Sequence, residues 1–253
     1  RVTCSGGRFH AVGSLRRGCD TCGDVDILAV DINPAVHDSF ITFSGVDRVL
    51  GHGDTKSSIL LRDGLQVDLR LVTGGNEGAA LQYFTGSKLH NIALRDRAIR
   101  LGLKLNEYGL FRVSDNTKIA GETEVDLYEA LGLQFIPPEL RENRGEIDAA
   151  ESGTLPRLIE RTAIRGDLHS HTTASDGRAD IETMAKAARA AGLDYLAITD
   201  HSQALAMANG LNETRTLKHA RAIREVNRRL PGITLLAGIE CDIRPDGTLD
   251  LSE

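Results

Sequence analysis

The sequence has no tryptophan, and aromatic residues make up only 4% of its 253 residues. No apolar run is long enough to span a bilayer, and no signal-peptide pattern opens the chain, so we expect a cytoplasmic protein without membrane contacts. Its four cysteines are too few and too scattered for a disulfide framework. Cys19 and Cys22 could form half of a zinc site, but no second CxxC exists, so two reduced thiols in a turn are the simpler interpretation.

Both ends are unlike those of a complete protein. The chain opens on Arg1, reaches an Asp-rich strand pattern almost at once, and stops at Glu253 soon after another strand pattern. We therefore expect a fragment of a longer protein.

The net charge of −6 argues against a uniformly basic surface, but the charge is unevenly distributed. Residues 83–112 carry six Lys or Arg against two Asp or Glu, whereas residues 113–153 carry ten acids against three bases. A basic stretch in an acidic protein can still attract nucleic acid, because the local field steers a polyanion. On charge alone, a solvated helix face remains the simpler interpretation.

The first 160 residues mix strand and helix patterns. Runs rich in Val, Leu and Ile predict strands at 25–30 and 67–72, each with an Asp beside its first Val. Residues 145–160 indicate a connector. A helix is expected over 86–103, with Lys88, Asn91 and Arg95 on one face and Leu89, Ile92, Ala93, Ile99 and Leu103 on another.

From about residue 164 the pattern becomes strand, helix, strand, helix, strand, which implies parallel strands with right-handed crossovers. Strands are expected at 195–199 and 233–239, and a helix capped by Asp180 should end at Gly192. A second helix is expected over about 214–230, with its buried face formed by Leu217, Ala220, Ile223, Val226 and Leu230.

Two carboxylates stand on the first predicted strand. Alternate residues of a strand face the same side, so Asp24 and Asp26 should project together. Two close like charges repel unless a cation joins them, and a divalent metal with oxygen ligands, most often Mg²⁺, is the usual solution. Asp68 could supply a third carboxylate if the two strands are neighbours, and three such carboxylates suit two metals that promote phosphoryl transfer.

A phosphate-binding turn precedes these carboxylates. Gly13 lets backbone N–H groups approach a phosphate closely, Ser14 adds a hydroxyl donor, and Arg17 can clamp phosphate oxygens in bidentate fashion. A Gly-Ser turn or an Asp-x-Asp strand alone would be weak signals. Their ordered combination predicts a nucleotidyltransferase-like site.

The stretches GSLRRG, GDVDIL, VDLRLV and YFTGS resemble the palm and thumb of family X DNA polymerases over roughly residues 8–150. The resemblance implies that Asp24, Asp26 and Asp68 are metal-binding catalytic carboxylates, with Asp68 assisting deprotonation of the primer 3′-hydroxyl. Lys88 and Arg95 would contact DNA, Arg95 from the minor-groove side. The incoming nucleotide would be contacted by Gly13, Ser14, Arg17, Gly23, Tyr83, Phe84, Gly86 and Asn91.

Histidines and acids follow the three predicted strands of the second region, at the strand ends where α/β folds build their sites. His169 and His171 alternate onto one face, and His nitrogen with carboxylate oxygen suits Zn²⁺, Mn²⁺ or Fe, which can activate water for phosphoester hydrolysis. The remaining histidines show no such pattern, and we expect surface or core roles for His10, His37, His52, His90 and His219.

The stretches DLHSHTTASDG, AITDHS and GIE resemble the opening motifs of the polymerase and histidinol phosphatase (PHP) domain, a seven-stranded β/α barrel with three metals. The similarity covers residues 164–253, and the later ligands of that family have no counterpart in it, so we expect weak or no exonuclease activity. Asp200 would support the ligands from behind. Metal roles are implied for His169, His171, Asp176, His201 and Glu240.

The predicted fold is an α+β nucleotidyltransferase palm and thumb followed by a truncated (β/α)7 PHP-type barrel. The predicted function is that of bacterial and archaeal family X polymerases: gap-filling DNA synthesis in base excision repair, with 3′–5′ exonuclease or 3′-end phosphoesterase action. A monomer would use dNTP and gapped or primer-template DNA, with Mg²⁺ or Mn²⁺ at the first site and Zn²⁺ or Mn²⁺ at the second. The predicted divisions are a partial palm (1–72), thumb (73–150), linker (151–163) and PHP segment (164–253).

Two other functions fit parts of the sequence. One is a PHP-type phosphatase for a small phosphomonoester, fused to another nucleotidyltransferase, and YFTGS with its basic helix argues against it. The other is a non-catalytic DNA-binding module with decayed sites, which the presence of Asp24, Asp26 and Asp68 disfavours.

Overall fold

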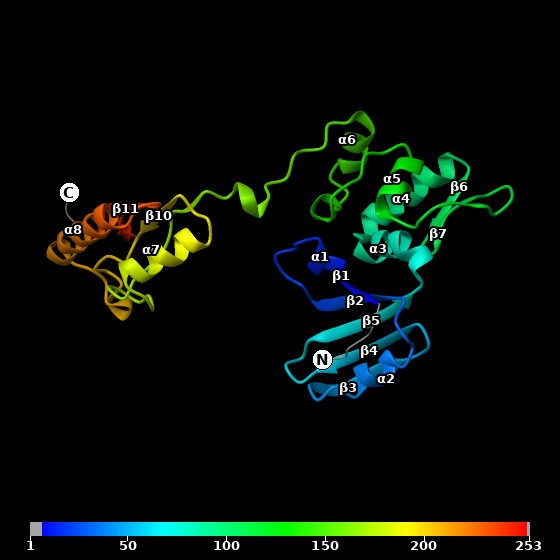
Figure 1. The fold of residues 1–253 in the computed structure, drawn as a ribbon, viewed down its shortest axis with the longest axis horizontal. Coiled ribbons are helices and arrows are strands. Elements are labelled where there is room, and N and C mark those ends of the chain that lie inside the picture. Colours follow the sequence, from blue (N-terminus) through cyan, green and yellow to red (C-terminus); the bar gives the residue numbers. More distant parts are fainter. Residues whose placement is uncertain (1–6, 252–253) are drawn as a thin grey trace. The chain divides into compact units, whose positions relative to one another are not determined.

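The computed structural model describes residues 7–251 and divides the chain into two units, Arg1–Pro156 and Arg157–Glu253. Figure 1 shows the elements of each unit in sequence colours. Among the described residues, no helix is both long and apolar enough to cross a membrane.

A five-stranded sheet in the order β1-β2-β5-β4-β3 opens the first unit. Strands β2 and β5 run parallel, and the other neighbours are antiparallel. The strands predicted at 25–30 and 67–72 are confirmed as β2 and β5, and they are neighbours. The strands are β1 (Arg8–Val12), β2 (Asp24–Val30), β3 (Val46–His52), β4 (Lys56–Leu61) and β5 (Gln66–Val72).

Both faces of this sheet are covered, one by α2 (Val36–Ile41) and the other by α3 (Glu77–Thr85). Leu28 and Val30 of β2 pack on the α3 side, whereas Ala29 lies in the cluster beside α2. Since strand side chains alternate, the acids at the start of β2 share a face with its buried Leu28 and Val30. On this face of β2, the first half of the strand therefore presents the acids and the second half presents buried core residues. The short helix α1 (Gly13–Arg16) joins β1 to the loop before β2.

The remainder of the first unit surrounds a separate core that includes Leu94, Leu110, Leu127 and Ile136. A three-stranded antiparallel sheet, absent from the sequence prediction, lies at this core. Its elements are α4 (Lys88–Arg100), β6 (Leu103–Asn106), β7 (Gly109–Arg112), β8 (Lys118–Ala120), α5 (Glu124–Ala130) and α6 (Glu146–Ser152). The segment expected to be a connector from residue 145 thus begins with a helix.

The apolar face predicted for this helix is not the face that α4 buries. The helix buries His90, Leu94 and Ala98, one turn apart each, and ends before Leu103, which begins β6. His90 is fully buried because Tyr128 Oη lies 2.9 Å from its Nε2 and Glu146 Oε1 lies 2.6 Å from its Nδ1. A hydropathy pattern cannot identify a buried histidine whose partners lie far along the chain. The apolar residues of α4 that remain exposed are Leu89, Ile92 and Ile99.

A buried ion-pair network ties α1 to the second core. Arg141 is fully buried, and its Nη1 donates to Glu124 Oε1 at 2.6 Å. Glu124 also accepts two hydrogen bonds from Arg16, at 3.0 and 2.5 Å. Burial alone would raise the pKa of Glu124, but the two arginines outweigh it and lower that pKa. Glu124 therefore stays ionised and holds both cations.

The second unit is a parallel three-stranded sheet, in the order β11-β10-β9, with two helices packed on one core. The predicted helices and the parallel strands are confirmed, and Asp180 caps α7 by accepting from Thr183 N. Leu217, predicted to be buried on α8, is instead 62% exposed. The elements are β9 (Gly166–Asp167), α7 (Ile181–Ala190), β10 (Tyr195–Ile198), α8 (Glu213–Arg229) and β11 (Thr234–Ala237).

Replacing Glu124 should destabilise the first unit strongly. Glu124→Gln leaves the buried Arg141 cation without a compensating charge, and we expect a loss of about 3 kcal/mol in the free energy of unfolding. Urea unfolding followed by circular dichroism measures it. Asp115→Asn, which removes an exposed partner of Arg112, is the control and should change little. An equally stable Glu124→Gln protein would contradict the assignment.

Candidate active site and metal centre

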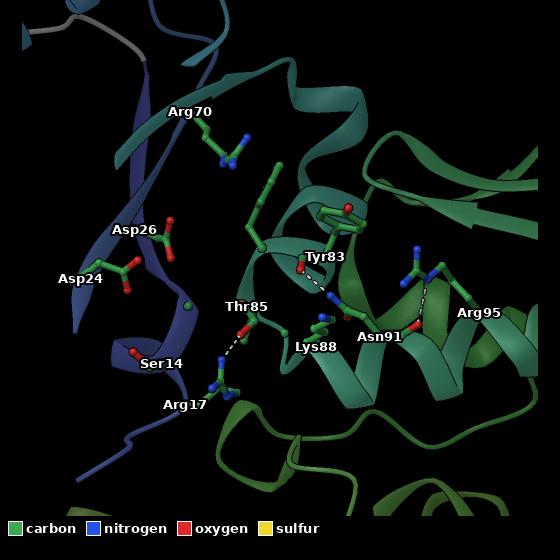
Figure 2. Close-up of a pocket in the computed structure, with 13 residues that line it drawn as sticks. Ser14, Arg17, Asp24, Asp26, Arg70, Tyr83, Thr85, Lys88, Asn91 and Arg95 are labelled. Carbon is green, nitrogen blue, oxygen red and sulfur yellow. Dashed lines mark hydrogen bonds between the residues drawn. The ribbon is translucent and has the colours of Figure 1, made fainter. Parts of the chain in front are cut away.

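Most of the predicted nucleotide and DNA contacts surround one cavity of 530 Å³ in the first unit (Figure 2). Gly23 and Asp68 are absent from its lining, whereas Arg70 and Thr85 belong to it without having been predicted. The cavity is lined by Gly13, Ser14, Arg17, Asp24, Asp26, Arg70, Tyr83, Phe84, Thr85, Gly86, Lys88, Asn91 and Arg95.

The turn at the start of α1 requires glycine. Gly13 has φ of +64°, a region that side-chain-bearing residues rarely adopt, and a Cβ there would lie 2.5 Å from Asp26 Oδ2. The turn and the carboxylate are thus packed directly against each other. Gly13, Ser14 and Asp26 therefore line the same cavity.

Asp24 and Asp26 point into this cavity from β2, as Figure 2 shows. The parallel register sets Asp26 opposite Asp68 on β5, so the three carboxylates lie on one face of the sheet. Burial raises the pKa of Asp26, and the charges of Asp24 and Asp68 raise it further. A cation between these oxygens would relieve that repulsion, so the donor set fits a divalent metal.

Asp68 is already neutralised by a cation from the protein. Lys56 Nζ lies 2.5 Å from its Oδ2, and Gln66 donates to its Oδ1 at 3.1 Å. Burial would raise the pKa of Asp68, but hydrogen bonds from Lys56, Ser58 and Gln66 outweigh burial and lower it. Asp68 is therefore a buried, ionised group on the same face of the sheet that does not itself line the cavity.

Arg70 is the main cavity residue that the sequence reasoning missed. Its guanidinium lies 4.4 Å from the centre of the Phe84 ring, and its buried Nε has no hydrogen-bond partner. Its charge opposes the rise in the pKa of Asp26. The signal was present in VDLRLV, because Asp68 and Arg70 alternate onto one face of β5.

Arg17 reaches the cavity from the other side. Its Nη1 donates to the backbone oxygen of Thr85 at 2.6 Å, and its Nε donates to Glu142 at 2.6 Å. Gly86 follows Thr85 with φ of +74°, and a Cβ there would lie 3.2 Å from Arg17 Nη1. The guanidinium therefore fills the space that a side chain at residue 86 would need.

The helical wall of the cavity is organised by Asn91 of α4. Its Nδ2 donates to the Tyr83 backbone oxygen at 2.7 Å, and its Oδ1 accepts from Gln82 at 2.7 Å. Arg95 Nε donates to the Asn91 backbone oxygen at 3.3 Å. Two of these bonds cross from α4 to α3, so the aromatic residues at the end of α3 are fixed against α4.

In the second unit, three imidazoles converge on one carboxylate oxygen. Glu240 Oε2 lies 3.3 Å from His169 Nε2, 3.2 Å from His171 Nε2 and 3.1 Å from His201 Nδ1. Asp176 Oδ1 lies 3.1 Å from His171 Nδ1. These donors come from the loops after β9, β10 and β11, as the strand-end argument predicts.

The geometry of this cluster fits a metal better than a set of hydrogen bonds. His169 Nε2 and His171 Nε2 are only 2.9 Å apart, and the buried Glu240 Oε2 has no well-oriented donor. Two groups of three side chains could each hold one ion, because their ligand atoms lie close together. One group is His169, His171 and Glu240, and the other is His171, Asp176 and His201. Nitrogen and oxygen donors of this kind suit Zn²⁺ or Mn²⁺.

Asp200 joins the segments that carry these ligands. It is fully buried and accepts from Thr172 N and Oγ1 at 2.8 Å and from Ser175 N and Oγ at 3.1 and 2.6 Å. His219 Nε2 of α8 lies 2.7 Å from Asp200 Oδ2. Burial would raise the pKa of Asp200, but His219 and the other donors outweigh it and lower that pKa. The expectation of a surface or core role for His219 therefore missed its contact with Asp200, behind the histidine and carboxylate cluster.

Comparison with known families gives one match in each of the two units. Residues 80–142 match the family described as DNA polymerase beta thumb, and residues 167–251 match the PHP domain. The resemblance inferred from the sequence motifs is thereby confirmed.

Two curated relatives and one solved structure are similar to parts or most of the chain. The chain is 40% identical over 249 residues, 97% of its length, to the "DNA polymerase/3′-5′ exonuclease PolX" of Bacillus subtilis (strain 168), of which it covers 43%. It is 30% identical over 169 residues, 52% of its length, to "DNA polymerase lambda" of Rattus norvegicus, of which it covers 28%. The chain thus spans less than half the length of these relatives. A crystal structure of Leishmania infantum polymerase beta in a ternary complex matches 54% of this chain and 67% of its own, with 24% identity and a TM-score of 0.47.

Asp26→Asn should stabilise the metal-free protein. Because the folded state raises the pKa of Asp26, ionisation of this group weakens folding as pH rises from about 4, the ordinary Asp value, through the raised one. We expect the variant to melt above the wild type in EDTA at pH 7 and to gain less from Mg²⁺. Thermal melts between pH 4 and 8 measure both effects. A difference in melting temperature between variant and wild type that widens toward low pH would contradict the assignment.

Weakening the Asp200 network should lower metal affinity in the second unit. We expect His219→Gln and Asp200→Asn to weaken Mn²⁺ binding by about 10- to 100-fold, because the ligand-bearing segments lose their common anchor. Equilibrium dialysis in an Asp26→Asn background measures it. His10→Gln, in the first unit, is the matched control. Unchanged affinity in both variants, with the protein folded, would refute the role.

Proposed function

This chain is a relative of the family X DNA polymerases that carry a PHP domain, and from that premise we propose that it extends primer 3′ ends with dNTPs in short gaps of DNA during base excision repair. The observation that supports this best is the single cavity in which the Gly13 turn, Asp24 and Asp26 face the end of α3 and the basic side of α4. We propose that it acts as a monomer in the cytoplasm on gapped or primer-template DNA.

Asp24 and Asp26 would hold Mg²⁺ or Mn²⁺, which when bound activates the 3′-hydroxyl and stabilises charge on the transferred phosphate. The Gly13 and Ser14 turn would donate to the triphosphate from its backbone N–H and hydroxyl groups, with Gly23 at the far end of the same loop. Arg17 would release Glu142 and the Thr85 oxygen in exchange for phosphate oxygens, a charge-assisted bidentate contact.

The role of Asp68 depends on Lys56. An ionised carboxylate with a lowered pKa is a weak base, so Asp68 can assist deprotonation of the 3′-hydroxyl, or ligate metal, only after Lys56 withdraws from it. We propose that Lys56 would move away from this carboxylate when the site is occupied, which would free Asp68 for either role.

The helical wall would recognise the base pair. Tyr83, Phe84 and Gly86 would lie beside the sugar and base of the incoming nucleotide, with Asn91 holding this segment in place. Lys88 and Arg95 of α4 would contact the DNA.

We further propose that the second unit is the start of a (β/α)7 PHP-type barrel that hydrolyses 3′-terminal phosphoesters. Leu236 of β11 is 42% exposed although it lies on a strand, which suits a sheet that continues with further strands. His169, His171, Asp176, His201 and Glu240 would hold Zn²⁺ or Mn²⁺. The proposed divisions are a palm to residue 72, a thumb over 73–150, a linker over 151–163 and the PHP segment from 164.

Primer extension tests the polymerase proposal. Asp24→Ala or Asp26→Ala should reduce dNMP incorporation into a gapped primer by at least about 10²-fold, because charge stabilisation at the reacting phosphate is lost. His169→Ala, in the second unit, is the control and should leave extension unchanged. Failure of the wild type to extend with Mg²⁺ or Mn²⁺ would remove the polymerase proposal, and release of phosphate from a small phosphomonoester would then favour a PHP-type phosphatase.

A further inference from the structure

The outer face of α8 is strongly basic. The helix carries six arginines or lysines and two glutamates over 17 residues, in a chain whose net charge is −6. In the part of the chain that the structure describes, no ion pair joins any of these basic residues to an acid. The neighbouring helix α7 differs, because its Lys186 is paired with Glu182 at 2.7 Å. The exposed basic residues of α8 are Lys218, Arg221, Arg224, Arg228 and Arg229.

A cavity lies at the start of this face. It measures 250 Å³ and is lined by Ala174, Leu211, Arg215, Lys218, His219 and Ala222. Arg215 donates to the backbone oxygens of Ala174 and Gly210 at 2.9 and 3.1 Å, which fixes its position without neutralising its charge. Lys218 has no hydrogen-bond partner in the described structure. The cavity is therefore a cationic pocket in which Arg215 is held in place and Lys218 is free to contact a ligand.

This pocket adjoins the metal centre. Its Ala174 stands two residues before Asp176, and its His219 contacts Asp200, the residue that precedes His201. An anion in the pocket would thus lie one loop away from the ligands. From Lys218 the basic face continues to Arg228, about 15 Å along the helix axis at 1.5 Å per residue. That length accommodates several phosphates of one strand.

We propose that the cationic pocket and the outer face of α8 bind the phosphate backbone of single-stranded DNA beside the metal centre of the second unit. A membrane surface fits less well, because the exposed side of α8 offers Leu217 as its one large apolar residue in the described structure. The cavity of 250 Å³ has room for a phosphate group but not for a base pair. The proposal rests on the proposed phosphoesterase role of this unit, since it assigns a path by which the strand approaches that site.

The test is the salt dependence of DNA binding by the full chain. Fluorescence anisotropy with a labelled 12-nucleotide oligothymidylate in EDTA, between 50 and 300 mM KCl, gives the slope of log affinity against log salt. Lys218→Gln with Arg221→Gln should weaken binding and lower this slope by about 1.4, at about 0.7 per phosphate contact on a single strand. The matched control is Lys186→Gln with Arg189→Gln on α7, which removes the same charge at the same spacing. It should leave the slope unchanged.

Two outcomes would overturn the proposal: equal slopes for both double variants, or photocrosslinks from a photoreactive oligothymidylate that fall only within residues 7–156. Crosslinks within 211–229 would support it. Mn²⁺ binding to the second unit, measured by equilibrium dialysis in the Asp26→Asn background, keeps this proposal apart from the phosphoesterase role on which it rests. If the wild-type second unit binds no Mn²⁺ while the α8 contacts persist, the phosphoesterase role fails alone. If Mn²⁺ binding is intact and the slope does not change, the α8 proposal fails alone.

Discussion

Electrostatic repulsion among carboxylates is the constraint around which the first unit is built. The parallel pairing of β2 with β5 sets Asp26 opposite Asp68, and Asp24 adds a third negative charge. The fold offsets this charge with Lys56 at Asp68 and with Arg70 near Asp26. Compensation is therefore complete at the buried acid and partial at the two acids that face the cavity. The remaining negative potential is located where a divalent cation and a triphosphate would be bound together.

The cluster in the second unit differs, because imidazole nitrogens converge there on a carboxylate instead of carboxylates converging on one another. Three imidazole nitrogens surround Glu240 Oε2, and this arrangement is held by a carboxylate that does not face the cluster. Asp200 is hydrogen-bonded to Thr172 after His171, to Ser175 before Asp176 and to His219 of α8. A ligand cluster made of three separate loops needs such a shared anchor, because each loop alone would relax away from its neighbours.

Local patterns predicted the parts of the molecule that depend on local geometry. The acids of β2 and β5 were identified because a strand fixes the side to which alternate residues point, and Asp180 was identified as a cap because its partner lies three residues away. The buried face of α4 was not predictable in this way. His90 is buried by partners 38 and 56 positions further along the chain, and their presence leaves the apolar residues of α4 outside. His219 was overlooked for the same reason, since the loop after β10 and the first turns of α8 separate it from Asp200 along the chain.

The alternation along β2 has an evolutionary consequence. Leu28 and Val30, which fill the core beside α3, project from the same face as Asp24 and Asp26. A shift of the strand by one residue would turn the carboxylates away from the cavity and would also expose these two core side chains. During evolution, a strand shift that turned the acids away would therefore also cost the packing beside α3. One strand register therefore sets both the direction of the carboxylates and the packing of Leu28 and Val30, so the core protects the alignment of the site against slippage.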